Sequence, residues 1–146
     1  MADRMAFTQR FHHPVEAVFG YLTDPRTRPE WQSSLRRVEL LTEQVSGTGT
    51  RWRDITWAGI APLMEVTTHE HLQAWAEDGT WRQVTAYLSL TFTPQGEETD
   101  VGVVVRLKAR GLLAAPVFLA SLLTPVALRG DLKRADRVLT ERLRGQ

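Results

Sequence analysis

Residues Leu112–Leu128 carry no charged side chain and run directly into a charge-rich segment that ends the chain. A helix that is apolar around its whole circumference must be covered on more than one side. The stretch is short for a bilayer span and contains Pro116 and Pro125, which argues against membrane insertion. The pattern therefore predicts a buried helix that is covered by the strand-rich middle of the chain. We expect room for an apolar ligand between the helix and the strands.

The composition limits the classes of partner. The chain has 146 residues, enough for one domain over residues 1–146, and a net charge of +1 from 18 basic and 17 acidic residues. No overall field attracts nucleic acid, so a small molecule or a protein is the expected partner, and the chain itself is expected to be a monomer or homodimer. The absence of cysteine excludes disulfides and thiolate chemistry. No secretion signal is visible, which predicts a cytoplasmic protein, and we expect no cofactor and no metal.

The first part of the chain predicts one strand and two helices. A short strand is expected within Ala2–His12 and a helix over Pro14–Leu22, where apolar residues recur at helical spacing until Asp24 and Pro25 end it. A second short helix is expected over Pro29–Ser34, anchored by Trp31.

Turn residues then recur at short intervals, which predicts an antiparallel meander of six strands. The expected strands are Arg36–Gln44, Thr50–Trp57, Leu63–His69, Leu72–Glu77, Trp81–Thr93 and Asp100–Ala109. Their expected separators are Ser46–Gly49, Ala58–Pro62, Asp78 with Gly79, and Pro94–Glu98. The last two strands alternate most clearly, and their expected dry faces carry Val84, Ala86, Leu88, Leu90 and Phe92, and Val101, Val103, Val105, Leu107 and Ala109.

The final helix is expected from about Leu113 to Arg144. Pro125 removes an internal hydrogen bond and predicts a kink near Ser121. Beyond it, one apolar stripe follows the helix while the charged residues lie mainly off that stripe, as in an amphipathic surface helix. The stripe consists of Leu128, Leu132, Ala135, Leu139 and Leu143.

Three segments carry a family resemblance that covers nearly the whole chain. They are HPVEAVFGYLTDPRTRPEWQSSLRRVELL at 13–41, VSGTGTRWRD at 45–54 and RGLLAAPV at 110–117. Together with the order of elements, they resemble the START-like superfamily, also called Bet v 1-like or SRPBCC, and within it the bacterial polyketide cyclase/dehydrase-like group. The resemblance implies an α+β helix-grip fold: a curved antiparallel sheet of about seven strands around a long C-terminal helix, with a hydrophobic cavity between them.

Candidate ligand-binding residues come from the dry strand faces, the uncharged helix and two of the tryptophans. Indole rings offer a large apolar surface and one donor, which suits a planar or polycyclic ligand. Trp31 and Trp52 are favoured because they lie in the segments that resemble the family. The expected lining is Trp31, Trp52, Leu88, Leu90, Phe92, Val103, Val105, Phe118, Leu122 and Val126.

Asp54 and His69 are the weak catalytic candidates. Asp54 shares a strand face with Trp52, so it is a buried acid or base if that face is concave and a solvated residue if the opposite face turns inward. His69 is a candidate if it pairs with Asp54 or Glu65. His69 and His71 have the spacing of a chelating pair, but without an evident third ligand we interpret them as solvated strand-end residues.

The sequence favours a protein that binds a small hydrophobic molecule, such as a lipid, a polyketide or another polycyclic or aromatic compound. One alternative is an enzyme of the polyketide cyclase or aromatase type that acts in the same cavity. Another is an interaction protein that docks through the apolar half of the C-terminal helix. A buried carboxylate with a polar partner in the cavity would place the enzyme first, whereas a wholly apolar wall would exclude it.

Overall fold

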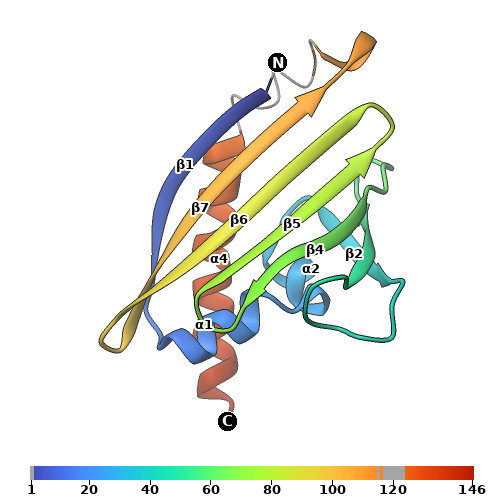
Figure 1. Cartoon of the computed structure of the whole chain (residues 1–146). Helices are drawn as coiled ribbons and strands as arrows, with labels where there is room; N and C mark the ends of the chain where they lie inside the picture. The colour runs from blue at the N-terminus through green and yellow to red at the C-terminus, as the bar shows by residue number, and fades with distance from the viewer. Residues whose placement is uncertain (1, 115, 117–123) are drawn as a thin grey trace.

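The computed structural model describes residues 2–114, 116 and 124–146. Seven antiparallel strands form one sheet in the order β1-β7-β6-β5-β4-β3-β2 (Figure 1). Short links between sequential strands give this meander, and β1 closes the other edge by pairing with β7. The strands are β1 (Ala2–Phe11), β2 (Leu35–Leu40), β3 (Arg51–Thr56), β4 (Leu63–Glu70), β5 (Ala74–Trp81), β6 (Val84–Gln95) and β7 (Glu98–Ala109).

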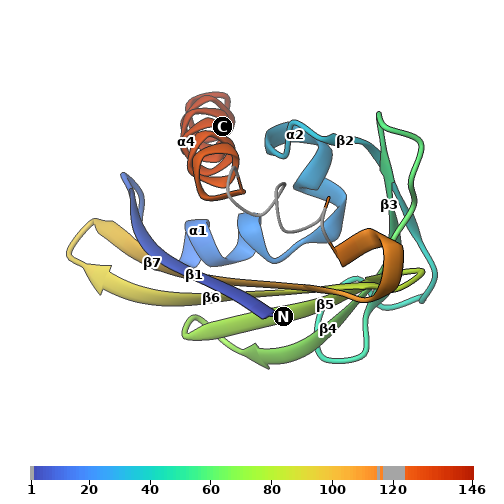
Figure 2. The same ribbon diagram turned by 90° about the horizontal axis from the view of Figure 1, so that it is seen from above.

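The helices lie on one side of the curved sheet, as Figure 2 shows. Those in the described part of the chain are α1 (Val15–Leu22), η1 (Pro25–Thr27), α2 (Arg28–Trp31), η2 (Gly111–Leu113) and α4 (Thr124–Arg144). This is the helix-grip fold that the sequence predicts. Within the described part of the chain, no helix has the length and apolar character needed to cross a membrane.

The expected dry faces of β6 and β7 are confirmed. Leu90, Phe92, Val101, Val103 and Val105 are buried, whereas Thr91 and Arg106 on the other face are exposed. The stripe of α4 completes this core, because Leu132, Ala135 and Leu139 are buried and Leu128 packs against them. Apolar faces of sheet and helix are thus removed from water together, which is the main driving force for this arrangement.

The break expected at Asp78 and Gly79 is wrong. Both residues belong to β5 and pair with Tyr87 and Ala86 of β6, and the hairpin turns four residues later through Arg82 and Gln83. Gly79 allows close approach, because a Cβ there would lie 2.8 Å from Sδ of Met64. A glycine that signals a turn in the sequence therefore marks a crowded point of the sheet instead.

Other boundaries differ by a few residues. β2 ends at Leu40 rather than at Gln44, and β5 begins at Ala74 because Leu72 occupies the preceding turn with a φ of 63°. The second helix covers Arg28–Trp31 instead of Pro29–Ser34. The kink expected near Ser121 lies outside the described residues.

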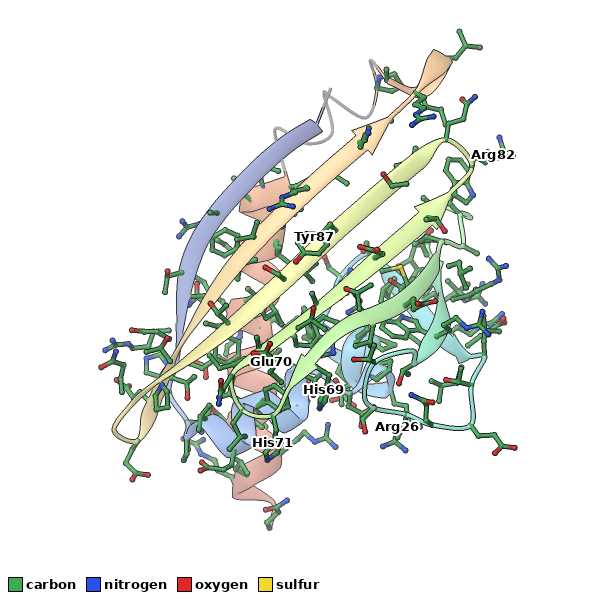
Figure 3. The ribbon with its side chains drawn as sticks, viewed as in Figure 1. Arg26, His69, Glu70, His71, Arg82 and Tyr87 are labelled. Carbon is green, nitrogen blue, oxygen red and sulfur yellow. The ribbon has the colours of Figure 1, made fainter. Side chains whose placement is uncertain are left out.

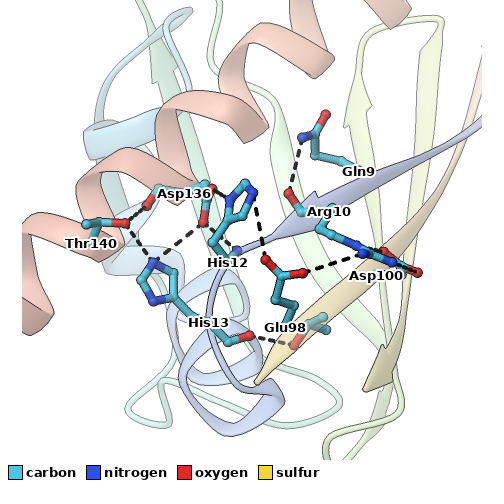
Figure 4. Close-up of polar contacts among 9 residues, drawn as sticks. Gln9, Arg10, His12, His13, Glu98, Asp100, Asp136 and Thr140 are labelled. Atoms are coloured by element: carbon cyan, nitrogen blue, oxygen red, sulfur yellow. Dashed lines mark hydrogen bonds and ion pairs between the residues drawn. The ribbon is translucent and has the colours of Figure 1, made fainter. Parts of the chain in front are cut away.

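A polar cluster connects the end of β1 to α4 (Figure 4). The backbone N–H of His12 donates to Oδ1 of Asp136 at 3.0 Å, and Nδ1 of His12 lies 2.5 Å from Oδ2 of the same carboxylate. Nε2 of His13 lies 2.7 Å from Oγ1 of Thr140, one turn further along α4. Arg10 pairs with Asp100 at 2.8 Å beside this cluster. These contacts hold the distal half of α4 against the sheet edge.

Candidate functional site

A cavity of about 330 Å³ lies between the sheet and the helices α2 and α4. Its wall is mainly apolar, as expected where a sheet and a helix both turn dry faces inward. Strands supply Met64, Gly79, Ala86, Leu88, Val105 and Leu107, the loop between β3 and β4 supplies Ile60 and Pro62, and the helices supply Trp31, Thr124 and Leu128.

Three ionisable side chains also belong to the wall: Arg28 of α2, Asp54 of β3 and Glu77 of β5. They are only 2%, 3% and 3% exposed. Nη2 of Arg28 donates to Oε1 of Glu77 at 3.0 Å and to Oδ2 of Asp54 at 3.4 Å. We call these residues the buried trio. One cation therefore lies between two carboxylates inside an apolar wall, where an unpaired charge would be very costly.

Trp52 fixes the orientation of the carboxylate of Asp54. Its Nε1–H donates to Oδ1 of Asp54 at 2.8 Å, and both side chains are buried on the same face of β3. The guanidinium carbon of Arg28 lies 5.4 Å from the ring centroid of Trp52 and 6.0 Å from that of Trp31, within range of cation–π attraction. The inward face of β3 is therefore the one that carries Trp52 and Asp54, which decides between the two registers left open by the sequence.

Burial raises the pKa of Glu77 to about 7, against the lowering effect of Arg28, and the charges of Asp54 and Asp78 raise it further. Burial by itself would lower the pKa of Arg28, yet the two carboxylates raise it above its ordinary value. Oε2 of Glu77 and Nε of Arg28 are buried without a hydrogen-bond partner among the described residues. Glu77 is thus an acid that can exist in both protonation states near neutral pH.

The structure separates the expected lining residues into four groups. Trp31, Leu88 and Val105 line the cavity together with Asp54. Val126 is 73% exposed and points away from the interior, and Phe118 and Leu122 lie outside the described residues. The remaining four are packed in the apolar core rather than in the cavity wall, namely Trp52, Leu90, Phe92 and Val103.

His69 lies apart from the buried trio. It is near the turn between β4 and β5, beside His71 (Figure 3), and both imidazoles contact the edge of the Phe19 ring, at 5.4 and 5.7 Å between centroids. Glu65, its expected alternative partner, is exposed on the other face of β4. Neither pairing considered for His69 is formed among the described residues.

Sequence reasoning missed Arg28 and Glu77. Arg28 lies in a segment that reads as a polar turn, and its burial depends on the tertiary contact with β3 and β5. Glu77 carried a usable signal: it alternates with Trp75, so it occupies an inward position of its strand. A charged residue at an inward strand position is unusual enough to indicate a site.

The chain belongs to the family described as "Polyketide cyclase / dehydrase and lipid transport", which matches residues 4–143. Its fold is also that of a solved START superfamily protein. No curated protein matches it in sequence.

Solved structures share the fold at low sequence identity. The Zhui aromatase/cyclase from Streptomyces sp. R1128 has a TM-score of 0.76 and 16% identity, covering 98% of this chain and 96% of that one. A START superfamily protein from Mycobacterium smegmatis has a TM-score of 0.72 and 11% identity, covering 94% and 97%. Norcoclaurine synthase from Thalictrum flavum, in complex with dopamine and hydroxybenzaldehyde, has a TM-score of 0.72 and 8% identity, covering 97% and 88%.

Proposed function

We propose that the chain binds a small hydrophobic molecule in the cavity and transfers protons on it, as an enzyme of the polyketide cyclase or aromatase type. The observation that carries this proposal is the buried trio in a mainly apolar wall. A carboxylate with a polar partner inside the cavity is the feature that places the enzyme ahead of a simple binding protein.

The chemistry follows from the two protonation states of Glu77. As a carboxylate it can accept a proton from the carbon next to a substrate carbonyl, so that the C–H electron pair forms an enolate. As Glu77 takes up this proton it loses its negative charge, so the positive charge of Arg28, which lies 3.0 Å from Glu77, becomes available to stabilise the negative charge that develops on the substrate oxygen. The protonated Glu77 then returns the proton to carbon or oxygen, which completes the transfer without any further reactant.

A binding protein without turnover is the second candidate. It is favoured by the way in which the trio is already engaged: Asp54 accepts from Trp52 and Arg28, and Glu77 accepts from Arg28. Because these groups already pair with one another, burial of apolar ligand surface, at about 25 cal/mol per Å² before association costs, would be the main source of affinity.

Hydrogen exchange on a model ketone separates the two candidates. The probe is 2-acetylnaphthalene in D₂O, with deuterium incorporation into its methyl group followed by NMR and its binding measured by calorimetry. The enzyme should accelerate exchange, and Glu77→Gln should lower that acceleration by about a hundredfold while binding persists. Glu65→Gln, which changes an exposed glutamate of the neighbouring strand, is the matched control and should behave as the wild type.

The other outcomes are equally informative. A ketone that binds but exchanges no faster than in buffer would contradict the enzyme and support the binding protein. Binding should disappear in Ala86→Phe, because that side chain fills the cavity. Retained binding in this variant would show that the probe occupies another place.

A further inference from the structure

We infer that the cavity selects uncharged ligands and rejects organic anions, including the carboxylates of fatty acids. The inference deepens the proposed function and rests on it, since it names the charge of the molecule that the same cavity takes. It follows from the charges of the wall and from the way in which the single cation is already used.

Arg28 is the only lysine, arginine or histidine among the described residues that line the cavity, and Asp54 and Glu77 are the only carboxylates there. With both carboxylates ionised the trio has a net charge of −1, and with Glu77 protonated it is neutral. No protonation state that keeps Asp54 ionised gives the wall a net positive charge. An anion would therefore enter a low-dielectric space without a free cation to balance it.

The guanidinium group of Arg28 is also held in place by its neighbours. Its Nη2 donates to both carboxylates, its Nε is buried without a hydrogen-bond partner among the described residues, and its guanidinium carbon lies 6.0 and 5.4 Å from the ring centroids of Trp31 and Trp52. For a ligand carboxylate to form a bidentate pair with Arg28, it would have to displace Asp54 or Glu77. The displaced carboxylate would then be buried without its partner, which costs more than the new pair returns.

The uncharged segment of the sequence supports the same conclusion. Residues 115 and 117–123, which lie outside the described part of the chain, contain no ionisable side chain, and the whole of Leu112–Leu128 carries none. The segment that connects η2 to α4 therefore adds no cation to neutralise an incoming anion, wherever its side chains lie.

Protonation of Glu77 modulates this selection. The charged groups that act on it are Arg28 from α2, Asp54 from β3 and Asp78 next to it in β5. Its neighbours across the sheet are Val66 in β4 and Leu88 in β6, which are apolar. Discrimination against anions should therefore be stronger above neutrality, where the trio is negative, than below it.

The test compares two probes of matched shape, 2-acetylnaphthalene and 2-naphthoate, by calorimetric titration of the whole chain. At about pH 8 the ketone should bind at least about tenfold more tightly than the carboxylate. In Glu77→Gln the ratio at this pH should fall severalfold, because the positive Arg28 then faces the single negative charge of Asp54 and the trio has no net charge. This variant keeps Arg28 paired with Asp54, so it should fold, and thermal unfolding monitored by circular dichroism verifies that it does.

Each outcome bears on a different statement. Equal or tighter binding of naphthoate, abolished by Ala86→Phe, would overturn the charge selection and leave the cavity as a binding site. Failure of both probes to bind would overturn the proposed function and this inference with it. A ketone preference that Glu77→Gln does not change would show that the trio is not its cause, and would also overturn the inference.

Discussion

Two ionic clusters join helices to the sheet of this protein, and they differ in their exposure to water. The buried trio connects α2 to β3 and β5, with each of its three residues almost fully buried. The surface cluster connects β1 to α4 through His12 and Asp136, whose side chains are 64% and 13% exposed. Water screens the second cluster and not the first, so similar distances correspond to very different energies.

The two clusters also differ in their roles: the buried trio belongs to the cavity wall, whereas the surface cluster attaches a helix to the sheet. A buried ionic group is expensive and is often no more stabilising than apolar residues of the same volume. The interior near α1 shows that this chain can fill its core with apolar side chains, since Phe19, Phe92 and Val101 pack there. The presence of three ionisable groups at the other end of the same interior is therefore better explained by the cavity than by stability.

The largest expected effect comes from Arg28→Met. The change removes the only cation of the trio and leaves two carboxylates buried, so the free energy of unfolding should fall by about 3–5 kcal/mol near neutral pH. Urea denaturation measures it. The loss should be smaller at about pH 5, because Glu77 then takes up a proton and only one buried charge remains.

Arg26→Met is the matched control for this substitution. Arg26 lies two residues away and pairs with Asp24 at 2.9 Å, but this pair is on the surface. The control should leave the urea midpoint unchanged. Equal losses in the two variants would show that burial does not distinguish the trio from an ordinary surface pair.

The next effect is the contribution of Glu77 to the pH dependence of stability, which Glu77→Gln should remove. The pKa of Glu77 is about 7 in the folded protein and 4.5 when exposed, so the folded state holds its proton over this range while the unfolded state releases it. Its contribution to stability is therefore complete below about pH 4.5 and is lost as the pH rises towards 7. The unfolding free energy of the wild type should decrease relative to the variant by about 2–3 kcal/mol over this interval, at about 1.36 kcal/mol per pKa unit.

Paired urea titrations of the wild type and Glu77→Gln at a series of pH values measure this difference. Glu65→Gln supplies the baseline for an exposed glutamate. A difference between wild type and Glu77→Gln that is constant with pH, or that grows in the opposite direction, would contradict the raised pKa of Glu77.

Much of the fold can be predicted from the sequence because it depends on local periodicity. The alternation of β6 and β7 and the stripe Leu132, Ala135 and Leu139 specify their buried faces without knowledge of the partners. Turn signals are less specific, as Gly79 shows. Glycine permits a turn and also permits close packing within a strand, and only the contact with the neighbouring Met64 decides between the two.

The site was predictable only in part, for a similar reason. The spacing of Trp52 and Asp54 places both on one face, but it does not say which face is concave. Arg28 reaches them from a helix 26 residues earlier in the chain, and Glu77 from a strand two places along the sheet. Such a cluster depends on the topology and curvature of the sheet, which no local pattern encodes. For this reason the residues expected from the sequence were mainly apolar.

The smallest effect is expected from Asp136→Asn in the surface cluster. The side chain of Asp136, through its hydrogen bond and its charge, raises the pKa of His12, so the folded state binds this proton more tightly than the unfolded state. The contribution is complete below the ordinary value of 6.5 and disappears as the pH rises through the raised pKa. Because His12 is mostly exposed, the loss should be below about 1 kcal/mol near pH 6 and undetectable at about pH 9.

Asparagine retains one oxygen that accepts from the backbone N–H of His12, so the variant keeps this hydrogen bond and removes the charge together with the acceptor that faces Nδ1 of His12. NMR titration of the imidazole in the wild type and in Asp136→Asn measures the pKa of His12 directly. Arg10→Gln leaves the contact between His12 and Asp136 in place and removes a charge that lowers this pKa, so it should shift the pKa in the opposite direction. Added salt should reduce the effect of Asp136→Asn and leave that of Arg28→Met nearly unchanged, since mobile ions reach only the exposed cluster. Equal salt sensitivity of the two variants would mean that the trio is solvated, and the low-dielectric cavity on which both proton transfer and charge selection depend would then be wrong.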